Sequence, residues 1–64
     1  MTYTALALFE MGKADEATHE TEAEARRWIE EERDANPDTF QTGRVIEVKP
    51  ALRIIATYDV KGWH

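Results

Sequence analysis

The sequence predicts an α+β fold, an antiparallel sheet of three to four strands with one helix packed on one face, in the order β(β)αββ. Three observations lead to this prediction. The chain opens with a run of β-forming residues, its middle has the pattern of one amphipathic helix, and its last third holds two strands of similar length. Residues 1–64 have room for a single domain, and a 42% apolar content is enough for a small core.

Residues 2–10 (TYTALALFE) form the first predicted strand. Its two faces carry alternating residues, Tyr3, Ala5, Ala7 and Phe9 on one and Thr4, Leu6 and Leu8 on the other, so that both look apolar. Gly12 and Lys13 predict a turn. Residues 16–20 (EATHE) then fit a short polar strand at the edge of the sheet, and this segment decides between three strands and four.

A helix is predicted for residues 22–35. Thr21 followed by Glu24 matches the capping box, in which a hydroxyl and a carboxylate satisfy two backbone N–H groups at the helix start. The apolar stripe of this helix consists of Ala25, Trp28 and Ile29, with Ala35 at its margin. Pro37 ends the helix, because proline lacks an N–H and disfavours the α conformation in the residue before it.

Residues 40–49 and 52–61 are predicted to form a hairpin of two strands, joined around Pro50 and Ala51. Gly43 is the expected site of a bulge. In the second strand, alternation places five residues on the face that suits the helix: Leu52, Ile54, Ala56, Tyr58 and Val60. The expected core therefore consists of Leu6, Leu8, Trp28, Ile29, Ile46, Val48, Ile54 and Tyr58.

One helix covers one face of such a sheet, which leaves apolar residues on the other. The residues expected there include Val45, Ile55 and either the Tyr3/Phe9 set or the Leu6/Leu8 set. A homodimer or a bound partner would cover this face, whereas scattered apolar residues on a solvated sheet are also normal in proteins. The residues of this alternative interface are Val45, Arg53, Ile55 and Thr57.

Charge is concentrated in one segment. Nine carboxylates and three arginines lie between Asp15 and Asp34, so this segment carries −6, whereas the whole chain carries −5. A one-sided acidic surface favours basic partners, and a row of carboxylates on a helix resembles the phosphates of a nucleic acid. The expected partner-binding residues are Glu24, Arg27, Glu30, Glu31 and Asp34. The alternative is that this charged face only keeps a small domain in solution.

Enzyme, metal and cofactor chemistry is not expected. The chain has neither Cys nor Ser, and His19 with its neighbouring carboxylates does not match a known metal-ligand spacing. A cluster of cations and one aromatic residue on the hairpin and tail (Arg44, Lys49, Arg53, Lys61 and Trp63) would suit nucleic acid, but a net charge of −5 opposes direct binding. No apolar run is long enough to span a membrane, so we expect a cytoplasmic protein.

Three segments resemble a group of very small phage and mobile-element proteins, which includes some anti-CRISPR proteins of the type I-F systems. These segments are residues 22–29 (EAEARRWI), 42–48 (TGRVIEV) and 61–63 (KGW). The resemblance implies a ββαββ fold and a non-catalytic inhibitor that binds a CRISPR surveillance complex and blocks its access to DNA. Some members use basic residues on the sheet whereas this chain is acidic, so no functional residue is carried over from the family.

Overall fold

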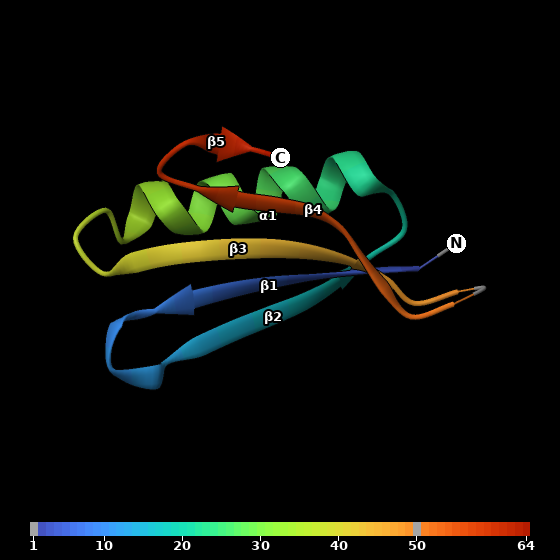
Figure 1. Ribbon diagram of the computed structural model, residues 1–64, viewed down its shortest axis with the longest axis horizontal. Coiled ribbons are helices and arrows are strands. Elements are labelled where there is room, and N and C mark those ends of the chain that lie inside the picture. The colour runs from blue at the N-terminus through green and yellow to red at the C-terminus, as the bar shows by residue number, and fades with distance from the viewer. Residues whose placement is uncertain (1, 50) are drawn as a thin grey trace.

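The protein has the expected α+β architecture, as a computed structural model that describes residues 2–49 and 51–64 shows (Figure 1). The elements are β1 (Tyr3–Phe9), the 3-10 turn η1 (Glu10–Gly12), β2 (Ala14–His19), α1 (Glu22–Ala35), β3 (Phe40–Glu47), β4 (Arg53–Asp59) and β5 (Gly62–Trp63). The described residues form one five-stranded sheet in the order β2-β1-β3-β4-β5, and every neighbouring pair is antiparallel. The helix α1 lies across one face of it (Figure 1).

The edge strand that the sequence left open is present as β2, and it starts at Ala14, two residues before the predicted segment. The connection from β1 reverses direction through Met11 and Gly12, whose φ angles are +64° and +75°. Glycine adopts this left-handed conformation at little cost, whereas Met11 carries a side chain that is 96% exposed. The tight reversal lets β2 pair with β1 from Ala14 onward.

The predicted helix is confirmed from Glu22 to Ala35. The backbone N–H of Glu24 donates to the Thr21 hydroxyl at 3.2 Å, and that hydroxyl donates to the Glu24 carboxylate at 3.0 Å. At the other end the N–H of Asn36 donates to the carbonyls of Glu32 and Arg33, which closes the last turn. These two caps fix the length of α1.

The core lies on the face of β1 opposite to the one predicted. The buried residues that pack together are Ala5, Ala25, Ile29, Val45 and Ala56, and Ala7 and Phe9 are buried on the same face of β1. Ile29 was predicted correctly, and Trp28 and Tyr58 pack at the margin. Four other predicted core residues lie on the opposite face, so their assignment was wrong: Leu6, Leu8, Ile46 and Ile54. Val48 follows the end of β3 and is not among the buried core residues either.

Close approach of α1 to the sheet explains this choice of face. A Cβ atom built on Gly43 would lie 2.4 Å from Cγ2 of Ile29, a distance at which carbon atoms overlap. Alanines at positions 5, 7 and 56 leave the rest of the space that the helix fills. The bulge predicted at Gly43 is wrong, because Gly43 pairs regularly with Ala7 and Tyr58.

A β-bulge in β4 changes which side chains share a face. Val45 pairs with Ala56 while the next residue, Ile46, pairs with Ile54, so Ile55 is an extra residue in β4. The simple alternation assumed for this strand therefore fails at Ile55. Ile54 lies on the face away from α1, and Ile55 packs against the core.

The alternative interface drawn from the sequence must be corrected accordingly. Val45 is fully buried under the helix, Ile55 packs against the core, and Arg53 forms an ion pair at 3.0 Å with Glu47, which is itself buried. Thr57 alone of the four lies on the face away from α1, because it pairs with Arg44.

The chain end adds a strand that was not predicted. Thr57 and His64 exchange two backbone hydrogen bonds of 2.8 Å, and Trp63 pairs with Tyr58. The turn between them depends on Asp59, whose carboxylate accepts the N–H of Lys61 at 2.8 Å, and on Gly62 at φ +95°. The connection predicted around Pro50 and Ala51 falls partly outside the described residues.

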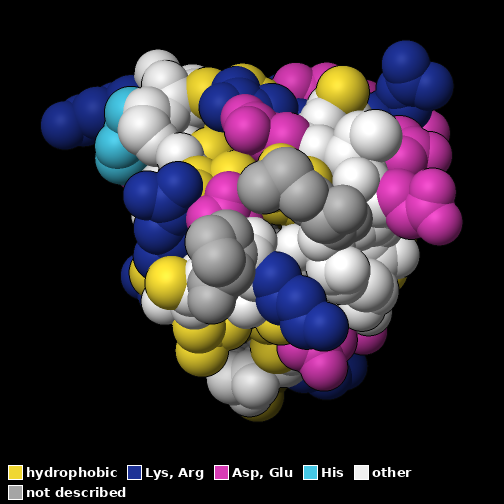
Figure 2. All heavy atoms as spheres, turned by 90° about the vertical axis from the view of Figure 1, so that its right-hand side faces the viewer, with side chains coloured by type: hydrophobic (Ala, Val, Ile, Leu, Met, Phe, Trp, Pro, Cys, Tyr) yellow, Lys and Arg dark blue, Asp and Glu magenta, His cyan; other side chains and the backbone are white. Residues whose placement is uncertain are grey.

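The face away from α1, called the open face below, carries large aliphatic side chains. Its residues are Thr4, Leu6 and Leu8 of β1, Ala14, Glu16 and Thr18 of β2, Thr42, Arg44 and Ile46 of β3, and Ile54 and Thr57 of β4. In the end-on view of Figure 2, hydrophobic side chains reach the surface at the lower left, and acidic side chains gather at the right. No helix in the described part of the chain is long and apolar enough to cross a membrane.

Candidate functional site

The two flanks of α1 differ in how their charges are paired. The flank towards β4 and β5, called the arginine flank, presents Arg26, Arg33, Tyr58 and Trp63. The flank towards β2, together with the adjoining outer surface of the helix, is called the acidic flank and consists of Asp15, Glu20, Glu24, Glu31 and Glu32. This separation follows from helix geometry, because residues that are seven apart, such as Arg26 and Arg33, lie on one side of a helix.

Arg26 is held by two partners on the arginine flank, Trp63 and Glu22. Its guanidinium carbon lies 4.7 Å from the centre of the Trp63 ring, and its Nη2 lies 2.7 Å from the Glu22 carboxylate. The indole N–H of Trp63 in turn donates to Glu30 at 2.9 Å. A cation over an indole face adds about 0.5–1 kcal/mol at a partly exposed site. These contacts attach β5 to the helix.

Arg33 repeats this arrangement two turns later. Its guanidinium carbon lies 5.2 Å from the centre of the Tyr58 ring, and Nη1 donates a hydrogen bond to the Tyr58 hydroxyl. Its Nη2 also lies 2.8 Å from Asp34. The carboxylate of Asp34 and then the hydroxyl of Tyr58 raise the pKa of Arg33 above its ordinary value. Both arginines of this flank are thus committed to contacts within the protein.

In the described part of the chain, the carboxylates of the acidic flank are not paired with arginines in this way. The pKa of Glu32 is raised above its ordinary value of 4.5, first by partial burial and then by the carboxylate of Asp15, which lies within hydrogen-bonding reach. The charge of Glu31 raises it further. The contributions of Asp15 and Glu31 to this raised pKa reflect negative charge close to Glu32. Within the described residues, none of the five carboxylates of the acidic flank forms an ion pair.

The five predicted contact residues divide into two groups. Glu24, Arg27 and Glu31 are exposed on the helix. Glu30 and Asp34 are instead occupied, by the indole of Trp63 and by Arg33 respectively. Sequence reasoning placed Asp15 and Glu32 in the acidic segment but did not bring them together. The pairing of β2 with β1 was the missing information, because it sets Asp15 beside the helix.

His19 and Trp28 lie between the acidic flank and the core. Their ring centroids are 6.2 Å apart. Nε2 of His19 is buried and has no hydrogen-bond partner among the described residues. An unsatisfied buried nitrogen costs stability. The His19–Trp28 contact therefore covers the core on the β2 side, while the unsatisfied Nε2 lowers the stability of the fold.

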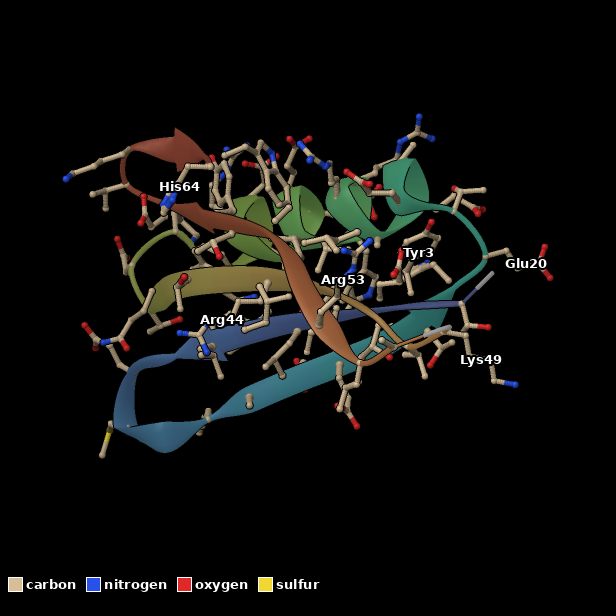
Figure 3. The ribbon with its side chains drawn as sticks, turned by 45° about the vertical axis from the view of Figure 1, so that its right-hand side comes forward. Tyr3, Glu20, Arg44, Lys49, Arg53 and His64 are labelled. Atoms are coloured by element: carbon tan, nitrogen blue, oxygen red, sulfur yellow. The ribbon has the colours of Figure 1, made fainter. Side chains whose placement is uncertain are left out.

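The cations that the sequence suggested for nucleic acid are not brought together. Figure 3 shows Arg44 and Lys49 at different ends of the sheet, with Arg53 between them. Arg53 is paired with Glu47, and Trp63 is held between Arg26 and Glu30. This surface does not form a continuous basic groove.

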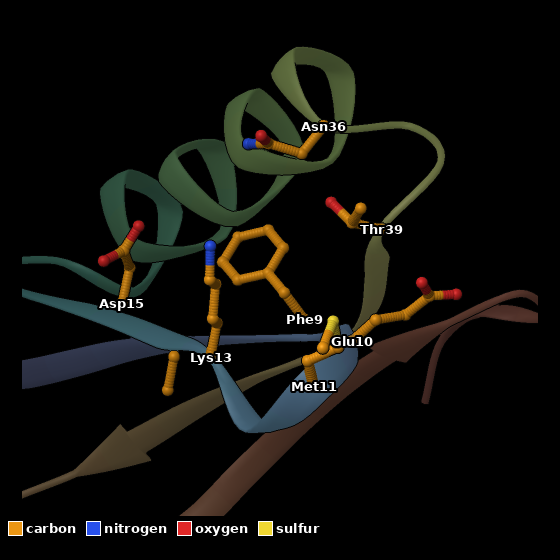
Figure 4. Close-up of a pocket in the computed structure, with 8 residues that line it drawn as sticks. Phe9, Glu10, Met11, Lys13, Asp15, Asn36 and Thr39 are labelled. Atoms are coloured by element: carbon orange, nitrogen blue, oxygen red, sulfur yellow. The ribbon is translucent and has the colours of Figure 1, made fainter.

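A pocket of about 550 Å³ lies where the β1–β2 turn meets the C-terminal end of α1 (Figure 4). Its wall combines the Phe9 ring with Lys13, Asp15, Asn36 and other polar residues. Phe9 is its one buried lining residue, and all of its polar lining residues are exposed. The pocket is an open hollow, and we assign no ligand to it.

Among the described residues there is no group of three or more His, Asp or Glu side chains placed to hold a metal ion. Comparisons of the chain with protein-family models, with curated proteins and with solved structures found no match.

Proposed function

We propose that this protein acts without catalysis, by docking its acidic flank onto a basic surface of another protein in the cytoplasm. The proposed partner is a protein that uses this basic surface to bind nucleic acid. In the specific case that we propose, the partner is a CRISPR surveillance complex and this protein is its phage-encoded inhibitor. The carboxylates then occupy the positions of phosphate groups and exclude the nucleic acid.

The orientation of the helix arginines is the observation that carries this proposal. Arg26 and Arg33 face Trp63 and Tyr58, so neither of them pairs with the carboxylates on the other side of α1. The pKa of Glu32 is raised first by partial burial, and the carboxylates of Asp15 and Glu31 raise it further, which agrees with negative charge gathered on this side. Charge of this kind also speeds association with a basic partner, because it acts over about 10 Å at moderate salt.

The test uses a double variant of the acidic flank, Glu20→Lys with Glu31→Lys. Both side chains are exposed and form no hydrogen bond or ion pair within the described residues, so the fold should be kept. The matched control is Glu10→Lys with Asp38→Lys, which changes the net charge by the same amount at exposed positions outside the flank.

A purified type I-F surveillance complex and a labelled DNA target provide the first measurement. The protein should prevent the complex from shifting the labelled DNA in a gel. The flank variant should need a concentration at least about tenfold higher for the same inhibition, and the control should act like the wild type. If the complex is not blocked, this specific partner is wrong. The second measurement uses a partner identified by capture from host lysate. If the flank variant and the control variant bind that partner with equal affinity, docking through the acidic flank is refuted.

A further inference from the structure

The open face combines apolar side chains with very little net charge. Leu6, Leu8 and Ile46 stand at its centre, and Ile54 beside them is 54% exposed. Of the residues of the open face named above, Glu16 and Arg44 carry the charges, one carboxylate and one guanidinium. The carboxylates of the acidic flank lie on other parts of the surface. Two copies of this acidic chain therefore repel each other least when they meet through this face.

The two charges of the open face are placed symmetrically about Leu6. Glu16 on β2 and Arg44 on β3 both pair with Leu6 on β1, so they lie one strand to either side of it, about 4.8 Å away in each direction. A two-fold axis that runs along β1 above Leu6 sets the β2 side of one copy over the β3 side of the other. Glu16 of each copy then faces Arg44 of its mate, and Leu6 meets Leu6.

We propose that the open face is the interface of a homodimer, with the apolar centre at Leu6 and two symmetric Glu16–Arg44 ion pairs at its sides. Charge complementarity argues for a second copy as the occupant, because the carboxylate of Glu16 and the guanidinium of Arg44 each meet their opposite about this axis. In the sheet order β2-β1-β3-β4-β5 the axis along β1 sets β2, β1 and β3 of one copy against β3, β1 and β2 of the other, and β4 and β5 lie beyond this contact.

This inference is independent of the proposed function, because the dimer leaves both acidic flanks on its outer sides. It adds one property to that function. Two flanks on one particle engage two basic sites at once, which strengthens attachment to a repetitive or symmetric target.

Sedimentation equilibrium of the full chain across a range of concentrations tests the proposal. The expected mass at high concentration is twice the 7.4 kDa of one chain. Leu6→Lys places a charge at the centre of the interface and should raise the dissociation constant at least about 30-fold. Thr18→Lys is the second variant, since Thr18 is exposed in the monomer and the axis sets it over Ile46 of the other copy. Far-ultraviolet circular dichroism confirms that each variant is folded.

A charge swap tests the two-fold geometry. Glu16→Arg and Arg44→Glu each create like charges across the interface and should weaken the dimer, whereas the double variant should restore it. Glu10→Arg, with the same change in net charge as Glu16→Arg but outside the face, should leave the dimer intact. A chain that stays monomeric at millimolar concentration, or a dimer that folded Leu6→Lys and Thr18→Lys both leave unchanged, overturns the proposal. A swap that weakens the dimer further overturns the Glu16–Arg44 pairing.

Discussion

Where α1 lies closest to the sheet, the two faces of the sheet differ in side-chain size. The covered face presents Ala5, Ala7, Gly43 and Ala56 to the helix, whereas the open face carries leucine and isoleucine in the neighbouring positions of the same strands. The difference shows that a single helix selects small residues, because they let Ile29 approach the backbone of β3. Large aliphatic residues are then left on the face without a helix.

The largest expected effect comes from Ile29→Ala. Ile29 is fully buried, so its truncation should lower the free energy of unfolding by about 2–5 kcal/mol. The matched change on the open face, Leu6→Ala, should cost clearly less, because Leu6 is only half-buried. Urea unfolding of both variants, at protein concentrations too low for association, measures the difference. Equal losses would show that side chains on the open face contribute as much to stability as those under the helix.

Gly43→Ala tests the close approach directly. The added methyl group would overlap Cγ2 of Ile29 and should cost about 1–3 kcal/mol. Ile29→Leu moves the branch point from Cβ to Cγ and removes that atom, so the double variant should lose less than the sum of the single changes. A double-mutant cycle from thermal unfolding gives the coupling. Additive losses would mean that Gly43 is required for another reason.

At the edge of the covered face, His19→Phe should raise stability by about 1 kcal/mol, because it removes the buried Nε2 that lacks a partner and keeps an aromatic ring beside Trp28. Thr18→Val is the control on the open face, and it should change the free energy of unfolding by less than about 0.5 kcal/mol. Urea unfolding at pH 7 measures both. If the phenylalanine variant loses stability, Nε2 of His19 has a hydrogen-bond partner and the prediction is wrong.

The smallest effect concerns Glu32, whose pKa is raised in the folded protein from its ordinary value of 4.5 by partial burial and by Asp15. A raised folded pKa favours folding below pH 4.5, and this contribution is lost as the pH rises through the folded value. Glu32→Gln removes the dependence, so the variant should gain stability relative to the wild type as the pH rises from about 4 to 7. Unfolding curves over this range measure the gain, with Glu10→Gln as the control. A constant difference would show that the pKa of Glu32 is not raised in the folded protein.

Local signals in the sequence were enough to predict the helix and the order of the main elements. Thr21, Glu24 and Pro37 fixed the bounds of α1, because caps and breakers act within a few residues. The β2 edge strand could be suspected from its polar composition, and its start at Ala14 follows from the left-handed turn at Met11 and Gly12.

The covered face of the sheet and the neighbours of the acidic residues depend on contacts between distant parts of the chain, which local sequence patterns do not reveal. Both faces of β1 are apolar, so alternation alone did not tell whether alanine or leucine lies under the helix, and we chose the larger residues wrongly. The extra residue Ile55 reversed the pattern in β4, and a bulge of this kind leaves no mark in hydrophobicity. For the same reason the acidic flank was predicted only in part: the contact of Asp15 with Glu32 depends on strand pairing and not on spacing along the chain.

The two tryptophans lie on different flanks of α1, Trp28 beside His19 on the β2 side and Trp63 beside Tyr58 on the β5 side. Replacement of either one by phenylalanine leaves a single indole fluorophore. Its emission then reports the detachment of one edge strand while the other edge stays silent. The chain thus holds two built-in optical probes, with which the loosening of each side of the molecule can be followed separately and without a dye.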